Sequence, residues 1–345
     1  MRIMMDCDTG IDDALAILYL LGSPDAELIG VTGVFGNVQE SVAVHNSRGL
    51  LDCLGRPDIP VYEGAGEPSY WQAGSGTAGR PYTIDPGCER FHGKNGFGGA
   101  QLPGLPSSYS RGSIYADGAA AIAEAVRRYD TGVTILATGP LTDIDEALRR
   151  APDIAPKMKL VMMGGTLTQP GNCYDLVCET NIINDPEAAD RVFHSGADIT
   201  MVGLDVTHQC LMTRGHMRAV GQADTPLAEF VCQMADYYIS ANEAADPVFA
   251  QGSPLHDPLA AAVALEPFLV QLFPISLRAE TRTGDGYGVR GRTVGDPAML
   301  HTSADKPGSN TPVPHTRAAL GVDSARFVSA WHKRLLKVCS EYPQR

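Results

Sequence analysis

Four aspartates stand within the first thirteen residues, namely Asp6, Asp8, Asp12 and Asp13. No lysine or arginine lies between Arg2 and Arg48 to neutralise them. Crowded carboxylates repel one another, so some would stay protonated unless a cation joined them. Carboxylate oxygens suit Ca²⁺ or Mg²⁺ better than zinc. The cluster therefore predicts a site for a hard divalent cation.

Asp12 and Asp13 are consecutive residues of a predicted helix, so their side chains should diverge by about 100°. We therefore expect one to bind the metal while the other faces a neighbouring ligand. The alternative is that both carboxylates only complement the positive N-terminus of the helix. That alternative explains two of the four acids.

A strand and a helix must position these acids. The apolar run at 3–5 predicts the end of a buried strand, and apolar residues at helical spacing from Ala14 to Leu21 predict a helix that stops at 22–24. The acids then lie in the turn at the carboxyl end of a strand, where open α/β sheets build their ligand sites.

The same alternation of strand and helix continues along the chain. Strands are predicted at 27–34, 59–62, 133–138, 159–165 and 199–204, and helices at 41–54, 117–129, 185–194, 225–245, 257–266 and near the C-terminus. The pattern predicts an α/β fold with an open mixed, mostly parallel Rossmann-like sheet and helices on both faces. We expect a single domain over 1–345.

Residues 64–112 break this alternation, being rich in Gly, Pro, Ser and Tyr. Long loops in compact domains usually serve as lids or flaps, so we expect a long flexible loop here. For 66–88 the alternative is a disordered insertion. The glycine-rich stretch 93–99 lacks the G-K-[ST] ending and the preceding strand of a phosphate loop.

Composition narrows the classes of partner. The 345 residues are 44% hydrophobic, enough for a large core, and the net charge of −13 argues against nucleic acid and anionic membranes. Eight cysteines without a C-x-x-C pair suggest reduced thiols. We expect no signal peptide, no apolar run able to span a bilayer, and a cytoplasmic protein.

Two further polar groups, Asn37 and the Thr138 carbonyl, follow other predicted strands, and His256 with Asp257 stands between predicted helices. Asp257 precedes a proline, the ordinary pattern of a helix N-cap, and His256 alone is equally ambiguous. The remaining candidates have ordinary structural readings as loop or core residues; they are Met163, Glu179 and Asn181.

The D-x-D-x-G-x-D-D-A stretch at 6–14 resembles the signature of the inosine–uridine-preferring nucleoside hydrolases. Further segments resemble family motifs in the same order, namely 36–38, 92–93 with 98–99, 138–142, 163–165, 170–172, Glu179 with Asn181, 185–189, 204–207, 256–258 and 290–294. One such motif would be weak, but the ordered series is specific.

The resemblance implies the nucleoside hydrolase fold and hydrolysis of the N-glycosidic bond of ribonucleosides, in a homodimer or homotetramer. It implies a bound Ca²⁺ with four protein ligands, namely Asp8, Asp13, Asp257 and the main-chain carbonyl of Thr138. Asp8 would take a proton from the attacking water and Asn37 would orient that water. Asp6 would contact a water at the metal, and His256 would protonate the leaving base.

For the substrate, the resemblance implies Asp12 and Asn181 at the ribose 2′- and 3′-hydroxyls and Asn172 and Glu179 at the 5′-hydroxyl. Met163 would pack near the sugar, and His92 would lie near the base on the mobile loop. The chemistry favours such a set, because positive charge builds on the sugar ring and the departing base needs a proton.

Three positions depart from the family pattern. Thr9 replaces a proline, Asn95 stands where an aspartate is common, and Thr180 replaces an aromatic residue between Glu179 and Asn181. We expect these changes to affect the base preference and not the reaction.

Two other functions fit parts of the sequence. A phosphatase of the haloacid-dehalogenase type would also use D-x-D after a first strand, but it needs a later lysine and a second acidic pair that do not appear in context. A nucleoside-binding protein on the same fold would bind substrate without releasing sugar. Phosphate release and sugar release distinguish the three functions.

Overall fold

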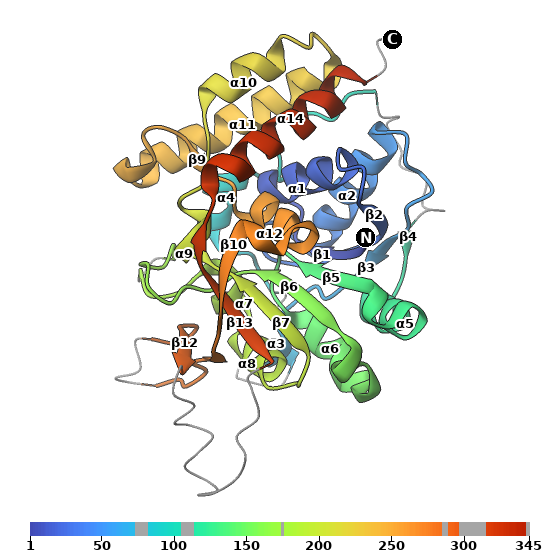
Figure 1. Ribbon diagram of the computed structural model, residues 1–345, viewed down its shortest axis with the longest axis vertical. Helices are drawn as coiled ribbons and strands as arrows, with labels where there is room; N and C mark the ends of the chain where they lie inside the picture. The colour runs from blue at the N-terminus through green and yellow to red at the C-terminus, as the bar shows by residue number, and fades with distance from the viewer. Residues whose placement is uncertain (73–81, 105–113, 174–175, 285–288, 297–314, 343–345) are drawn as a thin grey trace, which may run out of the picture.

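A long twisted sheet forms the centre of the molecule (Figure 1). The computed structural model describes residues 1–345 except 73–81, 105–113, 174–175, 285–288, 297–314 and 343–345. Within the described residues the sheet has nine strands in the order β10-β13-β7-β6-β5-β1-β2-β3-β4. Every neighbouring pair is parallel except β10 with β13. The predicted mixed, mostly parallel α/β sheet is confirmed.

The strands are short, as expected for a sheet covered on both faces. Their bounds, across the sheet, are β10 (Val270–Pro274), β13 (Thr316–Val322), β7 (Asp198–Val202), β6 (Lys159–Met163), β5 (Val133–Ala137), β1 (Arg2–Cys7), β2 (Glu27–Gly33), β3 (Val61–Glu63) and β4 (Ile114–Tyr115). Two small antiparallel pairs lie outside the sheet: β8 (Leu211–Met212) with β9 (Ser253–Pro254), and β11 (Ser276–Ala279) with β12 (Thr293–Asp296).

The strand order reverses between β1 and β5, which pair directly. From β1 the chain adds β2, β3 and β4 on one side, and from β5 it adds β6 and β7 on the other. The helices that follow these two strands therefore lie on opposite faces of the sheet. Such a switch point leaves a crevice at the carboxyl ends of the two strands. The acidic turn after β1 lies at this crevice.

Successive side chains of β1 enter different cores, since Met5 belongs to one hydrophobic cluster and Met4 to the other. The first cluster packs one face against α1 (Ile11–Leu21), α2 (Glu40–Cys53), α10 (Arg214–Gly221), α11 (Pro226–Ala245), α12 (His256–Leu265) and α14 (Ser324–Ser340). The second packs the opposite face against α5 (Gly118–Tyr129), α6 (Thr142–Arg150) and α8 (Pro186–Phe193).

The segment 64–112 contains more regular structure than predicted. Its described part includes α3 (Ser69–Gln72) and α4 (Pro86–His92), the latter capped by Asp85, whose carboxylate accepts from the Gly87 amide at 2.6 Å. After α4, Asn95 accepts from two backbone amides and donates to the Ala100 carbonyl at 2.9 Å. That last bond needs an amide, so asparagine suits this turn better than aspartate. Residues 73–81 of the predicted 66–88 insertion lie outside the described residues.

Several short elements were not predicted, because their residues carry no periodic pattern. They include α7 (Thr180–Asn184) and α9 (Leu204–Thr207), of which α9 begins directly after Gly203 and shortens the predicted strand at 199–204. Among the helices of the described residues, none combines the length and the apolar character needed to cross a bilayer.

Candidate active site

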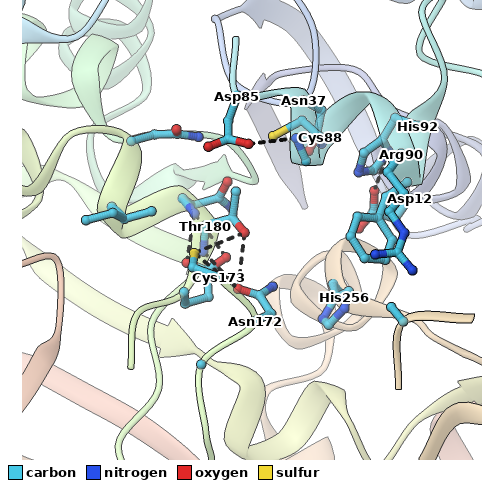
Figure 2. A pocket seen from close by; sticks show the side chains of 18 of the residues that line it. Asp12, Asn37, Asp85, Cys88, Arg90, His92, Asn172, Cys173, Thr180 and His256 are labelled. Atoms are coloured by element: carbon cyan, nitrogen blue, oxygen red, sulfur yellow. Dashed lines mark hydrogen bonds and ion pairs between the residues drawn. The ribbon is translucent and has the colours of Figure 1, made fainter. Parts of the chain in front are cut away.

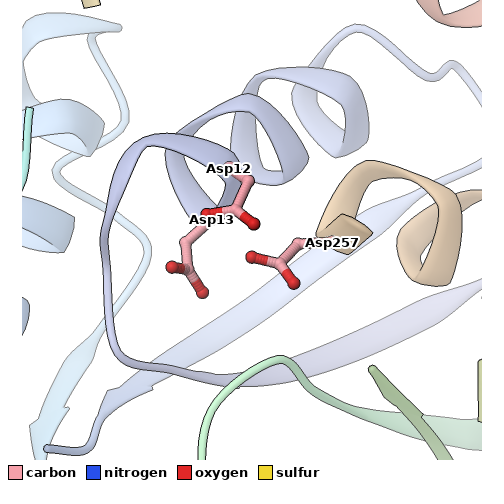
Figure 3. A group of neighbouring side chains, drawn as sticks. All are labelled: Asp12, Asp13 and Asp257. Carbon is pink, nitrogen blue, oxygen red and sulfur yellow. The ribbon is translucent and has the colours of Figure 1, made fainter. Parts of the chain in front are cut away.

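Buried carboxylates from two helices meet at the crevice between β1 and β5. Asp12 and Asp13 occupy the first turn of α1, and Asp257 is the second residue of α12. One oxygen from each of the three lies within 4.8 Å of the others, and all three residues are buried. Figure 3 shows the three carboxylates directed toward one space between the helices. The expectation that one of Asp12 and Asp13 binds the metal while the other faces a neighbouring ligand stays a prediction.

Asp8 lies beside this group and is held by the next β-α turn. Its carboxylate accepts from the Asn37 backbone amide at 2.7 Å and from the Asn37 side chain at 3.0 Å, and it contacts the Asp13 carboxyl. Gly36 makes this approach possible, since a Cβ there would lie 2.0 Å from Asp8 Oδ2. Asn37 also donates to Asp13 Oδ2 at 3.2 Å. One amide thus orients two of the predicted metal ligands.

The Asp13 carboxylate accepts hydrogen bonds from three separate parts of the chain. Its carboxylate accepts from the Gly10 amide at 2.8 Å and from the Thr138 hydroxyl at 2.6 Å, besides Asn37. Helix capping is therefore part of its role, as the alternative reading proposed. The main-chain carbonyl of Thr138, at the end of β5, accepts from the Asn181 side chain at 2.8 Å. A carbonyl oxygen has a second lone pair, so this bond leaves room for another partner.

The electrostatics of the cluster favour a cation. Burial is the largest cause of a pKa well above the usual range for both Asp8 and Asp257, and repulsion from neighbouring aspartates adds to it. Burial also raises the pKa of Asp12 to about 6. An opposite charge among the carboxylates would reverse these shifts. The donor set, all oxygen, suits Ca²⁺ or Mg²⁺, so the residues present fit the metal predicted from the sequence.

Asp6 lies behind the cluster and faces a second buried acid, Asp143 of α6. Burial raises the pKa of Asp6 well above its usual value, and repulsion from and hydrogen bonding to Asp143 raise it further. Burial also raises the pKa of Asp143 to about 7, although its carboxylate accepts from the Ala65 amide at 2.8 Å. Two carboxylates in contact share one proton. The pair links the cluster to the start of segment 64–112.

A second wall of the site comes from the chain after β6. Glu179 caps α7, and its carboxylate accepts from the amides of Gly165, Asn181 and Ile182 at 2.9 to 3.3 Å. Asn181 donates its side-chain amide to the carbonyls of Thr138 and Met163. The structural reading of Glu179 and Asn181 as residues that satisfy backbone groups is therefore correct, and both also line the cavity.

Two histidines stand near the opposite wall. His92, at the end of α4, is buried, and its Nδ1 atom accepts from the Ile11 amide at 3.2 Å. Burial lowers the pKa of His92 to about 4, so the ring is neutral beside Asp12. His256, the first residue of α12, lines the cavity, and its Nδ1 atom lies 2.8 Å from the Thr207 hydroxyl.

A cavity of about 780 Å³ lies beside the acidic cluster. Figure 2 shows Asn172 and Thr180 on one side and Asp12 and His92 on the other. Asn172 Oδ1 accepts from the Thr180 amide and hydroxyl at 3.0 and 3.1 Å. Of the predicted substrate and catalytic residues, the cavity is lined by Asp12, Asn37, His92, Met163, Asn172, Glu179, Asn181 and His256, together with the metal-ligand candidates Thr138 and Asp257.

Comparison with known proteins agrees with this geometry. The family described as inosine-uridine preferring nucleoside hydrolase matches residues 3–329. The chain belongs to this family. A nucleoside hydrolase is an N-glycosyl hydrolase, so the chain belongs to a family of enzymes that hydrolyse glycosidic bonds. The phosphatase function is thereby excluded.

Relatives of this nucleoside hydrolase carry names that differ in the nucleobase. Uridine nucleosidase 1 of Arabidopsis thaliana is 36% identical over 282 residues, which cover 81% of this chain and 79% of the relative. The pyrimidine-specific ribonucleoside hydrolase RihA of Klebsiella pneumoniae is 32% identical over 334 residues, covering 96% and 97%. The solved structure of a purine-preferring ribonucleoside hydrolase from Gardnerella vaginalis has a TM-score of 0.86 at 37% identity and covers 99% of both chains.

Sequence reasoning missed several residues of the nucleoside hydrolase cavity. Tyr238 of α11 donates its hydroxyl to Asp12 Oδ2 at 3.2 Å, and His208 packs its ring 5.7 Å from that of His256. Tyr238 sits inside a regular helical pattern that carries no motif. His208 directly follows the 204–207 motif, and this position next to a family motif is the sequence signal that could have identified it.

The departure at Thr9 has a structural explanation in this nucleoside hydrolase. The Thr9 hydroxyl lies 2.6 Å from the hydroxyl of Ser47 on α2, and both residues are fully buried. The hydrogen bond joins the acidic turn to α2, a link that a proline ring would not make.

Asp143→Asn should weaken the pH dependence of stability in the chelator-treated protein. A carboxyl group whose folded pKa is raised favours folding most below about pH 4, and its contribution is lost as the pH rises through about 7. Asparagine carries no such proton and can donate to Asp6. The free energy of unfolding, measured with urea, should fall between pH 5 and pH 8 in both proteins. The fall should be smaller in the variant than in wild type by on the order of 2 kcal/mol. Parallel losses in both proteins would contradict the shared proton.

Proposed function

We propose that this protein hydrolyses the N-glycosidic bond of ribonucleosides in a calcium-dependent reaction. One observation carries the proposal. Buried carboxylates of α1 and α12 converge at the strand-order reversal, on the wall of a cavity large enough for a nucleoside. The family membership supports the reaction, and the oxygen-only donors support calcium.

In this proposal Asp8, Asp13, Asp257 and the Thr138 carbonyl hold the ion. Asp12 has a carboxylate oxygen within 4.8 Å of oxygens from Asp13 and Asp257, so a fourth carboxylate stands beside the proposed ion site. When bound, the ion supplies positive charge that lowers the pKa of the surrounding carboxylates and of water. Asp6 stands behind the ligands and keeps its shared proton with Asp143.

Asp8 acts as the general base in this proposal. It takes a proton from the attacking water as the oxygen of that water bonds to the anomeric carbon. Asn37 holds Asp8 through two hydrogen bonds, so the carboxylate cannot rotate away from the water. The glycosidic bond breaks in the same reaction, and its electron pair passes to the nitrogen of the base. The positive charge that develops on the sugar is stabilised by the buried carboxylates.

Asp12 and Asn181 are the proposed partners of the 2′- and 3′-hydroxyls. Tyr238 fixes one oxygen of Asp12, and two main-chain carbonyls engage the Asn181 amide nitrogen. The Asn181 oxygen is then the atom that accepts from a hydroxyl. Met163 packs beside Asn181, with its sulfur 3.5 Å from the Asn181 amide nitrogen, and would contact the sugar.

Asn172 and Glu179 are the proposed partners of the 5′-hydroxyl. Thr180 occupies the Asn172 oxygen, so the amide nitrogen would donate to the substrate. Glu179 already accepts from three backbone amides, which fix its carboxylate at the cavity wall. Burial raises the pKa of Glu179 to about 7. A phosphate at this position would meet the ionised form of Glu179 above about pH 7, and there the two negative charges would repel each other.

His256 is the proposed acid for the leaving base, and His92, which also lines the cavity, would lie near that base. A proton on His256 Nε2 would pass to the base nitrogen as the glycosidic bond breaks. The homo-oligomeric state, the cytoplasmic location and the absence of nucleic-acid or membrane partners stay predictions from the sequence, as does the single-domain organisation.

Modified nucleosides test the proposed contacts. A 2′-deoxyribonucleoside leaves the buried acceptors Asp12 and Asn181 unpaired, so kcat/KM should fall by about 10³-fold or more. A ribonucleoside 5′-monophosphate places like charge beside Glu179, so kcat/KM for this compound should be lower by about 10²-fold or more. The measurement is release of reducing sugar from uridine, inosine and their 2′-deoxy and 5′-phosphate forms.

Glu179→Gln provides the matched comparison for the phosphate. It removes one negative charge and should narrow the gap between inosine and inosine 5′-monophosphate. Equal hydrolysis of both by the wild-type protein would make Glu179 a structural residue only and would favour a nucleotide hydrolase. Tight substrate binding without any release of sugar would favour a nucleoside-binding protein.

A further inference from the structure

The first residue of α12 is held by the last residue of α9. Thr207 is fully buried, and its hydroxyl oxygen lies 2.8 Å from Nδ1 of His256. The two residues are 49 positions apart in the chain, so tertiary structure alone brings them together. The contact occupies one of the two ring nitrogens of His256.

A small frame fixes the distance between these two elements. β8 begins shortly after α9, β9 ends just before α12, and the two strands pair in antiparallel fashion. The Leu255 amide adds a bond of 2.8 Å to the Cys210 carbonyl. This two-stranded ladder, which lies outside the main sheet, therefore holds the end of α9 next to the start of α12, where Thr207 and His256 lie.

The other end of α9 is anchored as firmly. The Leu204 amide donates to the Gly165 carbonyl at 3.0 Å, and the Asp205 carboxylate accepts from the Thr168 amide at 2.7 Å. His208 packs on His256 from the side, with the rings 5.7 Å apart and nearly edge to face. The ring of His256 thus has a fixed plane, and Nε2 is the nitrogen left for the cavity that His256 lines in Figure 2.

From this arrangement we propose that Thr207 is a positioning residue that accepts the Nδ1 proton of His256 and so confines the transferable proton to Nε2. The inference rests on the proposed function, in which His256 is the leaving-group acid.

The proton balance explains why an acceptor is needed. An imidazolium ring carries protons on both nitrogens. When the glycosidic bond breaks, its electron pair passes to the base nitrogen, which takes the Nε2 proton of His256. The product is the neutral ring with its proton on Nδ1. A buried Nδ1 proton without an acceptor would be costly, so removal of the Thr207 oxygen should favour the opposite tautomer and a poor acid.

Thr207→Val keeps the shape of the side chain and removes the acceptor. We expect kcat for inosine or uridine to fall about 10- to 100-fold with KM nearly unchanged, because a hydrogen bond to a charged ring is lost in the reaction step. A nitrophenyl riboside, whose leaving group departs without a proton, should react at nearly the wild-type rate. Thr207→Ser restores the oxygen and should recover most of the lost kcat.

Thr32→Val is the matched control. Thr32 is also fully buried, but among the described residues its hydroxyl has no hydrogen-bond partner, and Thr32 is not one of the residues that line the cavity. Its kcat should stay at the wild-type value on both substrates. An equal loss on the nitrophenyl riboside and on the nucleoside in Thr207→Val, or no rescue by serine, would overturn the proposal in favour of a structural role.

Histidine nitrogen NMR tests the same inference without turnover. In wild-type protein labelled with ¹⁵N-histidine, the neutral ring of His256 should carry its proton on Nδ1, and in Thr207→Val on Nε2, with His256→Gln giving the assignment. A proton on Nε2 in the wild-type ring would contradict the proposal even if the nucleoside is hydrolysed. Absence of any sugar release from wild type, with the Nδ1 proton present, would instead contradict only the proposed function.

Discussion

Asp13→Ala should abolish metal binding and turnover together. The Asp13 carboxylate lies within 4.8 Å of oxygens from Asp12 and Asp257 and also contacts Asp8, so its loss removes the centre of the donor set. We expect no bound calcium after gel filtration and a fall in kcat of about 10³-fold or more, because the ion and the general base depend on the same group. Mass spectrometry of metal content and a sugar-release assay on one sample provide the measurement.

Asp145→Asn is the control for this variant. Asp145 is equally buried, but its carboxylate binds Arg149 and Arg191 on the opposite face of the sheet. Its loss should lower the free energy of unfolding and leave the calcium content unchanged. Retention of bound calcium by a folded Asp13→Ala protein would show that the ion sits elsewhere.

His256→Ala should slow the hydrolysis of natural nucleosides by about 10²–10⁴-fold, the usual contribution of a positioned acid. The nitrophenyl riboside should be affected far less, since its leaving group needs no proton. Parallel rate measurements on inosine, uridine and the nitrophenyl compound provide the comparison.

His194→Ala is a suitable control, because His194 is exposed beyond the end of α8, where its ring lies close to Asp190 of the same helix. It should leave all three rates unchanged. A similar loss on every substrate in His256→Ala would assign the histidine to binding or to the fold, and would remove the basis for a role of Thr207.

The order of strands and helices was predictable because each element carries its own pattern. The apolar run of β1 followed by the helical spacing of α1 placed the acidic turn at the end of a strand, where the structure has it. The family motifs supplied the other members of the site. Asp257 could not be assigned by pattern alone, since aspartate before proline is an ordinary cap and only the packing of α12 against α1 brings it to Asp13.

Other features depend on tertiary structure and have no local signal. Tyr238 reaches Asp12 from a helix more than 200 residues away, and Asp143 faces Asp6 from across the β1–β5 boundary. The divergence expected for Asp12 and Asp13 follows from helix geometry at the Cα atoms. The oxygens of both side chains nevertheless lie within 4.8 Å of each other and of Asp257, an arrangement that depends on the packing of α12 against α1.

Calcium titration of the metal-stripped protein tests the central claim most directly. Bound calcium, measured by equilibrium dialysis, and sugar released from inosine or uridine are followed in the same samples. The proposal predicts that activity is absent without metal and rises in proportion to occupancy, reaching its maximum at one ion per chain. Full release of sugar by protein that contains no metal would contradict it.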